Sequence, residues 1–254
     1  MILDPTKIPT REKLILAGLY LAKYDAAGLK RLGLESFLEG FNVIGYALGA
    51  RPASIKNYRD EFDPLVSKRR KGWHKRPTRE YCLRIFEDYK CLDFDTFTAL
   101  IQSFTGLDEN ILSEVRTKED KREAESFFAK RLITGLAAER YFESVQPQIS
   151  EFKGHIVENT TRLGCGYDFR LSRGSQYEFL AVEVKGLRDN TGGVSLTPKE
   201  YNVAAAMTDR FFLFVVKNFR EAPYHETYRN PLASGLRFAK KERVVVHVSW
   251  LTAL

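Results

Sequence analysis

Residues 163–186 read LGCGYDFRLSRGSQYEFLAVEVKG. Two runs in which apolar and polar residues alternate, 167–171 and 179–185, flank the polar turn 172–176, and this pattern predicts a β-hairpin. One face of the hairpin is expected to carry Tyr167, Phe169, Leu171, Leu180, Val182 and Val184. The opposite face is expected to carry Asp168, Arg170, Ala181, Glu183 and Lys185. Two carboxylates and an amine should therefore gather near the ends of neighbouring strands.

Asp168, Glu183 and Lys185 indicate a metal-dependent hydrolytic site. Two carboxylates held close together raise each other's pKa and repel, unless positive charge lies between them. Oxygen ligands of this kind, supplemented by water and substrate phosphate, suit Mg²⁺. The ammonium of Lys185 could orient or help to deprotonate the attacking water, and phosphodiester hydrolysis uses all three groups. The competing interpretation is an exposed salt bridge between Glu183 and Lys185, which would contribute little.

The composition fits a globular protein with a sizeable core, because 44% of the 254 residues are hydrophobic and 29% are charged. Such a chain could form one large domain or two of ordinary size. No apolar run approaches the roughly 18 residues of a membrane span, so no membrane partner is expected. The first residues lack the order of a secretory signal. The three cysteines form no CxxC pair, so a structural zinc site is not expected and a reducing cytoplasm is predicted.

The formal net charge of +7 is unevenly distributed. Residues 68–79 read KRRKGWHKRPTR, with seven Lys or Arg residues and no acidic residue. A basic run interleaved with Trp73 and His74 is typical of a loop that contacts phosphates. The predicted DNA contacts in this run are Lys68, Arg69, Arg70, Lys71, Lys75 and Arg76. The alternative is a solvated, flexible connector.

Residues 41–62 read FNVIGYALGARPASIKNYRDEF and resemble the helix-turn-helix family over about twenty residues. Gly49 would lie in the turn, Gly45 would let the two helices approach closely, and Pro52 would occupy the first turn of the second helix. That helix would expose Ser54, Lys56, Asn57 and Arg59, which are side-chain types that read base edges or phosphates. An ordinary helical hairpin would use the same apolar contacts.

The chain is expected to divide near residue 115 into a helical domain, 1–115, and a second domain, 116–254. Residues 79–104 are expected to continue the helical part. The second domain should open with a helix over about 120–145 that has Glu139 inside its apolar stripe. A buried carboxylate needs a partner, which would be either a buried arginine or backbone amide, or the metal cluster.

Further strands are expected at 155–161 and 210–217, and a last strand at 243–250 after a polar loop, 218–241. Between them, Thr197, Pro198 and Glu200 form the pattern of a helix capping box. Glu200 is therefore predicted to be a cap first and a site residue second. The resulting order is helix, strand, strand, strand, helix, strand, an α/β arrangement with a mixed central sheet.

This order resembles the PD-(D/E)XK nuclease superfamily, because a carboxylate lies on the first helix, Asp168 on the second strand and a Glu-x-Lys motif on the third. The pieces GLAAERYF, GYDFRL, FLAVEVKG and LTPKEYNVA, within residues 135–205, resemble more narrowly the NO VEIN C-terminal-like branch. The resemblance covers roughly the last 130 residues and implies an αβββαβ nuclease core.

The resemblance also implies a Mg²⁺-dependent nuclease in which Mn²⁺ can substitute. Asp168 and Glu183 would bind the metal, with Glu139 as an additional or water-mediated ligand and the Val184 carbonyl as a further oxygen. Lys185 would position the attacking water.

The leading hypothesis joins the two halves in one enzyme: a helical domain recognises double-stranded DNA, and a nuclease domain cuts it. A restriction endonuclease or a phage-defence nuclease is its concrete form. Cutting both strands is simplest with two active sites, so a homodimer is expected. The alternatives are a DNA-binding regulator with an inert nuclease-like domain, and a structure-selective repair nuclease.

Overall fold

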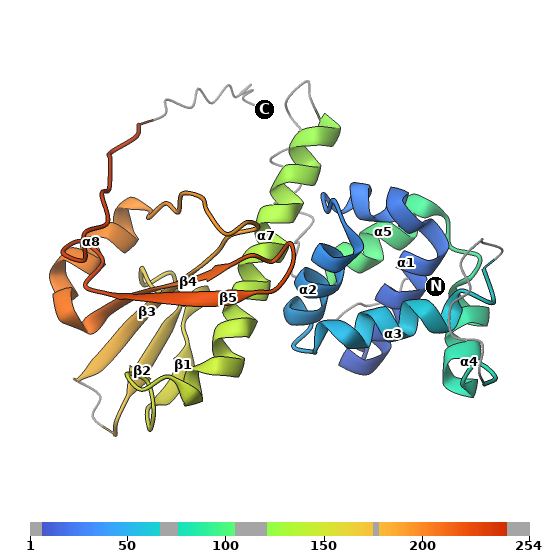
Figure 1. Ribbon diagram of the computed structural model, residues 1–254, viewed down its shortest axis with the longest axis horizontal. Helices are drawn as coiled ribbons and strands as arrows, with labels where there is room; N and C mark the ends of the chain where they lie inside the picture. Colours follow the sequence, from blue (N-terminus) through green and yellow to red (C-terminus); the bar gives the residue numbers. More distant parts are fainter. Residues whose placement is uncertain (1–6, 67–75, 105–120, 175–177, 243–254) are drawn as a thin grey trace, which may run out of the picture.

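The computed structural model describes residues 7–66, 76–104, 121–174 and 178–242, and of residues 121–132 it describes the backbone alone. The first part is helical: α1 (Thr10–Arg31), α2 (Phe37–Ala47), α3 (Pro52–Phe62), α4 (Glu80–Tyr89) and α5 (Phe94–Ser103). The second part contains α7 (Lys121–Val145), β1 (Ile156–Asn159), β2 (Phe169–Ser172), β3 (Phe179–Gly186), α8 (Pro198–Met207), β4 (Phe211–Lys217) and β5 (Tyr224–Arg229). The chain is therefore α/β, with a helical part followed by a mixed sheet (Figure 1). Within the described ranges no helix is long and apolar enough to cross a membrane.

The helix pair α2–α3 lies where the helix-turn-helix pattern predicted two helices and a turn. Gly49 adopts a φ of +68° in the turn, a conformation that favours glycine. A Cβ atom on Gly45 would lie 2.9 Å from the Cα of Pro52, so only glycine permits this close approach of the helices. Pro52 begins α3, where its missing N–H is not needed.

Residues 79–104, expected to continue the helical part, form two helices with a break after Tyr89. Asp93 caps the second of them, α5, because its Oδ1 accepts a hydrogen bond of 2.9 Å from the N–H of Thr96. A short polar side chain at this position competes with the helical backbone and so favours a new helix start.

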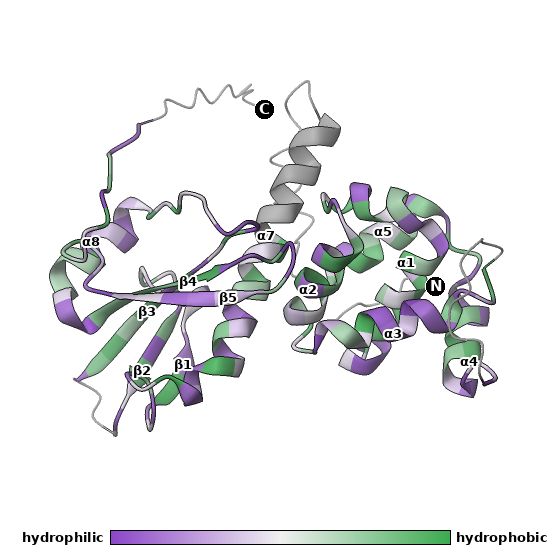
Figure 2. Cartoon of the chain, in the orientation of Figure 1, coloured by the Kyte–Doolittle hydropathy of each residue, from purple (hydrophilic) through white to green (hydrophobic). Residues whose placement is uncertain are grey.

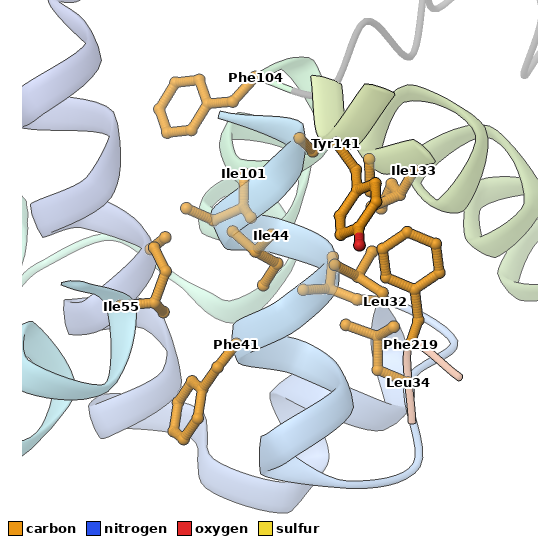
Figure 3. Close-up of a cluster of buried hydrophobic side chains, with 14 of the residues drawn as sticks. Leu32, Leu34, Phe41, Ile44, Ile55, Ile101, Phe104, Ile133, Tyr141 and Phe219 are labelled. Atoms are coloured by element: carbon orange, nitrogen blue, oxygen red, sulfur yellow. The ribbon is translucent and has the colours of Figure 1, made fainter. Parts of the chain in front are cut away.

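The helical part and the sheet part share one continuous hydrophobic core, and α7 lies between them (Figure 1). The ring of Tyr46 in α2 lies 5.3 Å from the ring of Tyr141 in α7 and 6.3 Å from that of Phe219. Asn42 donates hydrogen bonds of 2.9 Å to the backbone carbonyls of Phe219 and Glu221. Figure 3 shows Phe219 and Tyr141 meeting side chains of the helical part in this core. The predicted boundary near residue 115 falls outside the described residues.

The sheet has the order β1-β2-β3-β4-β5, and its strands are antiparallel except for the central pair β3–β4. Helix α8 makes the crossover between these parallel strands. In β2 and β3, Phe169 lies opposite Val182. The position before Phe169 therefore lies beside the position after Val182, which brings Asp168 next to Glu183.

The two faces of the sheet are covered by different helices. One face belongs to the main core, together with Ala137, Ala138, Tyr141 and Phe142 of α7. Its strand residues are Phe169, Leu171, Val182, Val184, Phe212, Phe214 and Val216. The opposite face carries a small apolar cluster formed by Ala181, Phe211 and Ala204 of α8. This second face also carries Glu183 and Lys185, because they alternate with Val182 and Val184.

Two sequence predictions about the sheet are wrong. Tyr167 does not share the face of Phe169: it packs with Phe179, at 5.8 Å between ring centroids, in the smaller cluster on the opposite face. β2 begins only at Phe169, and Gly166 with a φ of +94° turns the chain before it, so strand alternation does not reach Tyr167. The segment 218–241 is not all loop, because it contains β5. The strand predicted at 243–250 lies outside the described residues.

Candidate active site

Asp168 is fixed at the start of β2 by hydrogen bonds on both sides. Its N–H donates to the Val182 carbonyl at 3.0 Å, and its carbonyl accepts from the N–H of Thr160 at 2.8 Å. Its side-chain Oδ2 accepts a hydrogen bond of 2.8 Å from the N–H of Val184. The N–H and C=O of one strand residue point toward the same edge, so the Val184 carbonyl also faces the strand that Asp168 precedes.

Glu183 and Lys185 lie on the same face of β3 and contact each other directly. Lys185 Nζ donates to Glu183 Oε1 at 2.5 Å. Their neighbours on β4 are Leu213 and Val215, which are apolar and buried. Glu183 is only 3% exposed, so this carboxylate is held in a poorly solvated position. A lone exposed salt bridge, the competing interpretation, does not describe this burial.

Glu200 at the start of α8 also binds Lys185. The Thr197–Glu200 capping box is confirmed: the N–H of Glu200 donates to Thr197 Oγ1 at 3.2 Å, and the N–H of Thr197 donates to Glu200 Oε2 at 2.9 Å. The same Oε2 accepts a hydrogen bond of 3.0 Å from Lys185 Nζ. One oxygen therefore connects the start of α8 to the amine on β3.

Glu139 reaches the site from α7, which lies against the end of β3. A Cβ atom on Gly186 would lie 2.8 Å from the carbonyl oxygen of Thr134 and 3.2 Å from the Cβ of Ala138, so glycine permits this close packing. Glu139 lies near enough for the charges of Asp168 and Lys185 to act on its carboxyl group. The structure thus brings Asp168, Glu183 and Lys185 together, and Glu139 is near enough for the charges of Asp168 and Lys185 to act on it. The chemical roles of these four predicted catalytic residues stay predictions.

The electrostatics of this cluster are dominated by burial and excess negative charge. Burial, and after it the Asp168 carboxylate, raises the pKa of Glu139 to about 7. Burial likewise raises the pKa of Asp168 and of Glu183, whose two carboxyl groups lie next to each other. Burial lowers the pKa of Lys185, but Glu183 and Glu200 outweigh it, so this pKa is raised and the amine stays protonated. Nearby positive charge would relieve the cost of ionising these acids.

The donor set fits a hard divalent cation in chemistry, since Asp168, Glu183 and Glu139 supply carboxylate oxygens at one end of the sheet. Among the residues that the structure describes, no three His, Cys, Asp or Glu side chains are arranged to hold a metal ion as they stand. One oxygen of Asp168 accepts from the backbone of Val184, and one oxygen of Glu183 accepts from Lys185. Metal binding therefore stays a prediction that rests on the chemistry of the donors.

Three of the four DNA-reading candidates on α3 lie where a ligand could approach them. Lys56 and Asn57 are exposed, and Ser54 is half-buried. Their helix is mostly hydrophilic (Figure 2). The opposite side of α3 carries the fully buried Ile55 and packs on α1 and α2.

Arg59 does not fit the predicted DNA-reading role. Its guanidinium carbon lies 3.6 Å from the centroid of the Phe37 ring, and its side chain is 11% exposed. Arg59 also lies 4.0 Å from the carboxylate of Asp25. A planar guanidinium stacks well on an aromatic ring, so Arg59 serves the packing of α3 against its neighbours.

Arg76 is the predicted phosphate contact of the basic run 68–79 that lies within the described residues. Its Nη1 donates to Glu61 Oε1 at 3.1 Å, so its charge is partly compensated inside the protein. The other predicted contacts lie outside the described residues: Lys68, Arg69, Arg70, Lys71 and Lys75.

Sequence reasoning underrated Glu200 as a site residue, because the capping box gave it a sufficient structural role. A signal was present: the capping box stands at the start of the helix that follows the Glu-x-Lys strand, where the crossover to the next parallel strand begins. A side chain in the first turn of that helix lies close to the carboxyl end of β3.

Residues 138–229 match the family model described as "Protein NO VEIN, C-terminal". No protein of curated function and no solved structure matches the chain. The matched residues include Glu139, Asp168, Glu183, Lys185 and Glu200. This chain therefore contains, from late α7 to the end of β5, a region similar to the C-terminal region of NO VEIN.

Proposed function

We propose that this protein is a Mg²⁺-dependent endonuclease that hydrolyses phosphodiester bonds of double-stranded DNA. The observation that carries the proposal is the convergence of Asp168, Glu183 and Lys185 at one end of β2 and β3, with Glu139 nearby. Buried groups with perturbed pKa values and a mutual arrangement of this kind are characteristic of catalytic sites.

Each residue has a role that follows from its position. Asp168, Glu183 and Glu139 would hold Mg²⁺, and the Val184 carbonyl could add an oxygen. When bound, Mg²⁺ supplies Lewis-acid activation and offsets negative charge on the phosphate. Lys185 keeps a protonated amine beside these carboxylates, where it would orient the attacking water and stabilise charge that develops on the phosphoryl oxygens.

The helical part would bind the duplex. Lys56 and Asn57 are exposed on α3, and the basic run that follows this helix would contact phosphates. Because α2 packs on α7, the helical part would be held in a fixed position relative to the candidate active site. A site-specific restriction or phage-defence nuclease that acts as a homodimer is the form we propose.

A DNA-binding regulator with an inert nuclease-like domain is the second candidate. It is favoured by the pairing of Lys185 with two carboxylates, and by the finding that no three acidic, His or Cys side chains in the described residues stand ready to hold a metal. A structure-selective repair nuclease is the third, since Arg59 is engaged inside the protein and a nuclease of this kind needs no base-reading helix.

Incubation of the full-length protein with supercoiled plasmid and Mg²⁺ separates these candidates. Discrete fragments support a site-specific endonuclease, and a smear supports a nonspecific or structure-selective nuclease. Tight binding without cleavage supports the regulator. The control is the Asp168→Asn variant, which keeps the size of the side chain but removes its charge. Equal cleavage by this variant and the wild type would attribute the activity to another site or to a contaminant.

A further inference from the structure

We propose that Glu200 is a positioning residue that holds the amine of Lys185 in its working place, in addition to capping α8. This inference rests on the proposed nuclease function, since it assigns Glu200 a part in the same site. It assigns no contact between Glu200 and the substrate or a metal ion: Glu200 would act through Lys185.

The first argument is the hydrogen-bond capacity of the amine. A lysine ammonium has three N–H donors. One is directed to Glu183 Oε1 at 2.5 Å and a second to Glu200 Oε2 at 3.0 Å. The two acceptors come from different elements, β3 and α8, so together they fix the direction of the remaining donor. A single acceptor would leave the flexible lysine side chain free to rotate about one contact.

The second argument is that Glu200 is itself firmly held. Its Oε2 accepts from the Thr197 N–H at 2.9 Å, and its own N–H donates to Thr197 Oγ1 at 3.2 Å. Pro198 restricts the backbone between these two residues. Since the capping box already orders the Glu200 side chain, holding Lys185 costs little further conformational entropy.

The third argument is competition for the amine. Glu183 is one of the carboxylates proposed to bind Mg²⁺, and Lys185 lies two residues further along the same strand. The described contacts pair the Lys185 ammonium with two carboxylates, Glu183 and Glu200. If Glu200 were removed, Glu183 would be the partner that remains among these contacts. With Glu200 present, the amine is shared between two carboxylates, at 2.5 Å from Glu183 Oε1 and 3.0 Å from Glu200 Oε2. This sharing would weaken the competition of Lys185 with a metal ion for the Glu183 carboxylate.

The capping role can be separated from the positioning role by substitution. Glu200→Gln retains the capping box, because Gln at this position also accepts from the N-cap N–H, but it removes the charge that holds the ammonium. Thr197→Ala is the matched control: it removes the hydroxyl half of the cap but leaves the backbone N–H that orients Glu200. A merely structural role for Glu200 predicts a larger effect of Thr197→Ala than of Glu200→Gln on every property.

The experiment compares both variants with the wild type in two assays. In steady-state cleavage, kcat of Glu200→Gln should fall roughly 10- to 100-fold with KM for DNA unchanged. Thr197→Ala should keep its kcat and lose only thermal stability. In the second assay, the metal-free protein is treated with acetic acid N-hydroxysuccinimide ester, and acetylation of Lys185 is followed by mass spectrometry. Glu200→Gln should label Lys185 severalfold faster, since the amine loses a charged partner, and Thr197→Ala should label at the wild-type rate.

The labelling assay needs no activity, so it distinguishes failure of this inference from failure of the proposed function. Absence of cleavage by the wild type would overturn the proposed nuclease function. The labelling result would then decide whether Glu200 holds Lys185 in place. Cleavage by the wild type together with full kcat in Glu200→Gln would overturn the positioning role. Equal rates of Lys185 acetylation in the wild type and in Glu200→Gln would also overturn the positioning role.

Discussion

Glu61 of α3 and Glu183 of β3 are both buried carboxylates, but their pKa values move in opposite directions. Glu61 is 2% exposed and accepts hydrogen bonds from two guanidinium groups: from Arg79 Nε at 2.7 Å and from Arg76 Nη1 at 3.1 Å. Burial alone would raise the pKa of Glu61, but these bonds and one from the Arg79 backbone lower it to about 2. The pKa of Glu183 is raised by burial and by the neighbouring Asp168 carboxylate.

The difference lies in how many cations each site supplies. Glu61 has two arginine partners for one carboxylate, so its burial is fully compensated. At the end of β3, Lys185 is the ammonium that hydrogen-bonds to Glu183 and Glu200, while Asp168 and Glu139 add further carboxyl groups. Burial of a charged group is therefore a poor guide to function by itself. An excess of buried acidic groups over basic groups is a better guide to function. Such an excess costs folding free energy unless a bound cation balances the negative charge.

The largest expected effect is on the rate of DNA cleavage when a residue of the candidate active site is changed. Lys185→Ala should lower the cleavage rate by about 10²- to 10⁴-fold, because the protonated amine that orients water and stabilises phosphate charge is lost. Binding of duplex DNA, measured by mobility shift in the absence of Mg²⁺, should be nearly unchanged. Lys199→Ala, which removes an exposed lysine of α8, is the matched control and should cleave normally. A fully active Lys185→Ala protein would remove this residue from the mechanism.

The next largest effect is on the stability of the fold when Glu61, the carboxylate paired with Arg76 and Arg79, is changed. Glu61→Gln should lower the free energy of unfolding at pH 7 by about 1–3 kcal/mol, since both guanidinium groups lose a charged acceptor. Urea denaturation followed by circular dichroism measures this change. Glu87→Gln is the control, because Glu87 is 62% exposed in its pair with Lys90 and such pairs contribute little. Equal losses in the two variants would contradict the assignment of Glu61 as a structural ion pair.

The effect of Glu61→Gln should depend on pH in one direction. The folded pKa of about 2 lies below the ordinary 4.5, so the stabilisation by Glu61 is fully present above about pH 4.5 and declines as the pH falls toward 2. The difference in unfolding free energy between the wild type and Glu61→Gln should thus shrink from pH 5 to pH 2. A difference that grows over this range would have the wrong sign.

At the candidate active site, the same type of substitution should act in the opposite direction. In metal-free protein at pH 8, Glu139→Gln should raise the free energy of unfolding by about 1 kcal/mol, because a carboxyl group with a pKa near 7 is ionised there at a cost. The gain should disappear near pH 4, where Glu139 is protonated in both folded and unfolded chains. Glu143→Gln, on the same helix but paired with Arg140, is the control. A loss of stability in Glu139→Gln at pH 8 would contradict the charge excess.

The smallest expected effect concerns DNA contacts of α3. Lys56→Ala should lower the slope of log affinity against log salt by about 0.9, which corresponds to one lost phosphate contact. Arg59→Gln should leave this slope unchanged and lower the melting temperature, because Arg59 stacks on Phe37. The two variants compare an exposed cation with an internally engaged one on the same helix. Unchanged slopes in both would separate α3 from DNA binding.

The sequence predicted that Asp168, Glu183 and Lys185 lie close together, because strand alternation and hairpin pairing are local. Once 167–171 and 179–185 are taken as paired strands, Asp168 must come close to Glu183 and Lys185. The capping box of α8 was predicted for the same reason, since Thr197 and Glu200 are three residues apart. Helical periodicity predicted that Glu139 lies within the apolar stripe of its helix. The packing of α7 against Gly186 at the end of β3 shows how that helix comes close to the site.

What the sequence did not reveal depends on contacts between distant residues. β5 has a polar sequence, YHETYR, and is largely hydrophilic (Figure 2), but it pairs with the edge of the apolar strand β4. His225 in β5 stacks on the Phe214 ring at 4.7 Å, a contact that no local pattern predicts. Arg59 likewise had the composition and spacing of a DNA-reading residue, and only its position over Phe37 shows the internal contact.

The central claim is that the uncompensated carboxylates at the end of β2 and β3 hold a divalent cation. Titration of Mn²⁺ into the metal-free protein, followed by electron paramagnetic resonance of the free ion, tests it most directly. The predicted result is a bound Mn²⁺ in the wild type and in Glu61→Gln, and loss of that binding in the Asp168→Asn/Glu183→Gln double variant. Absence of Mn²⁺ binding to the wild type, or binding that survives the double substitution, would contradict the claim.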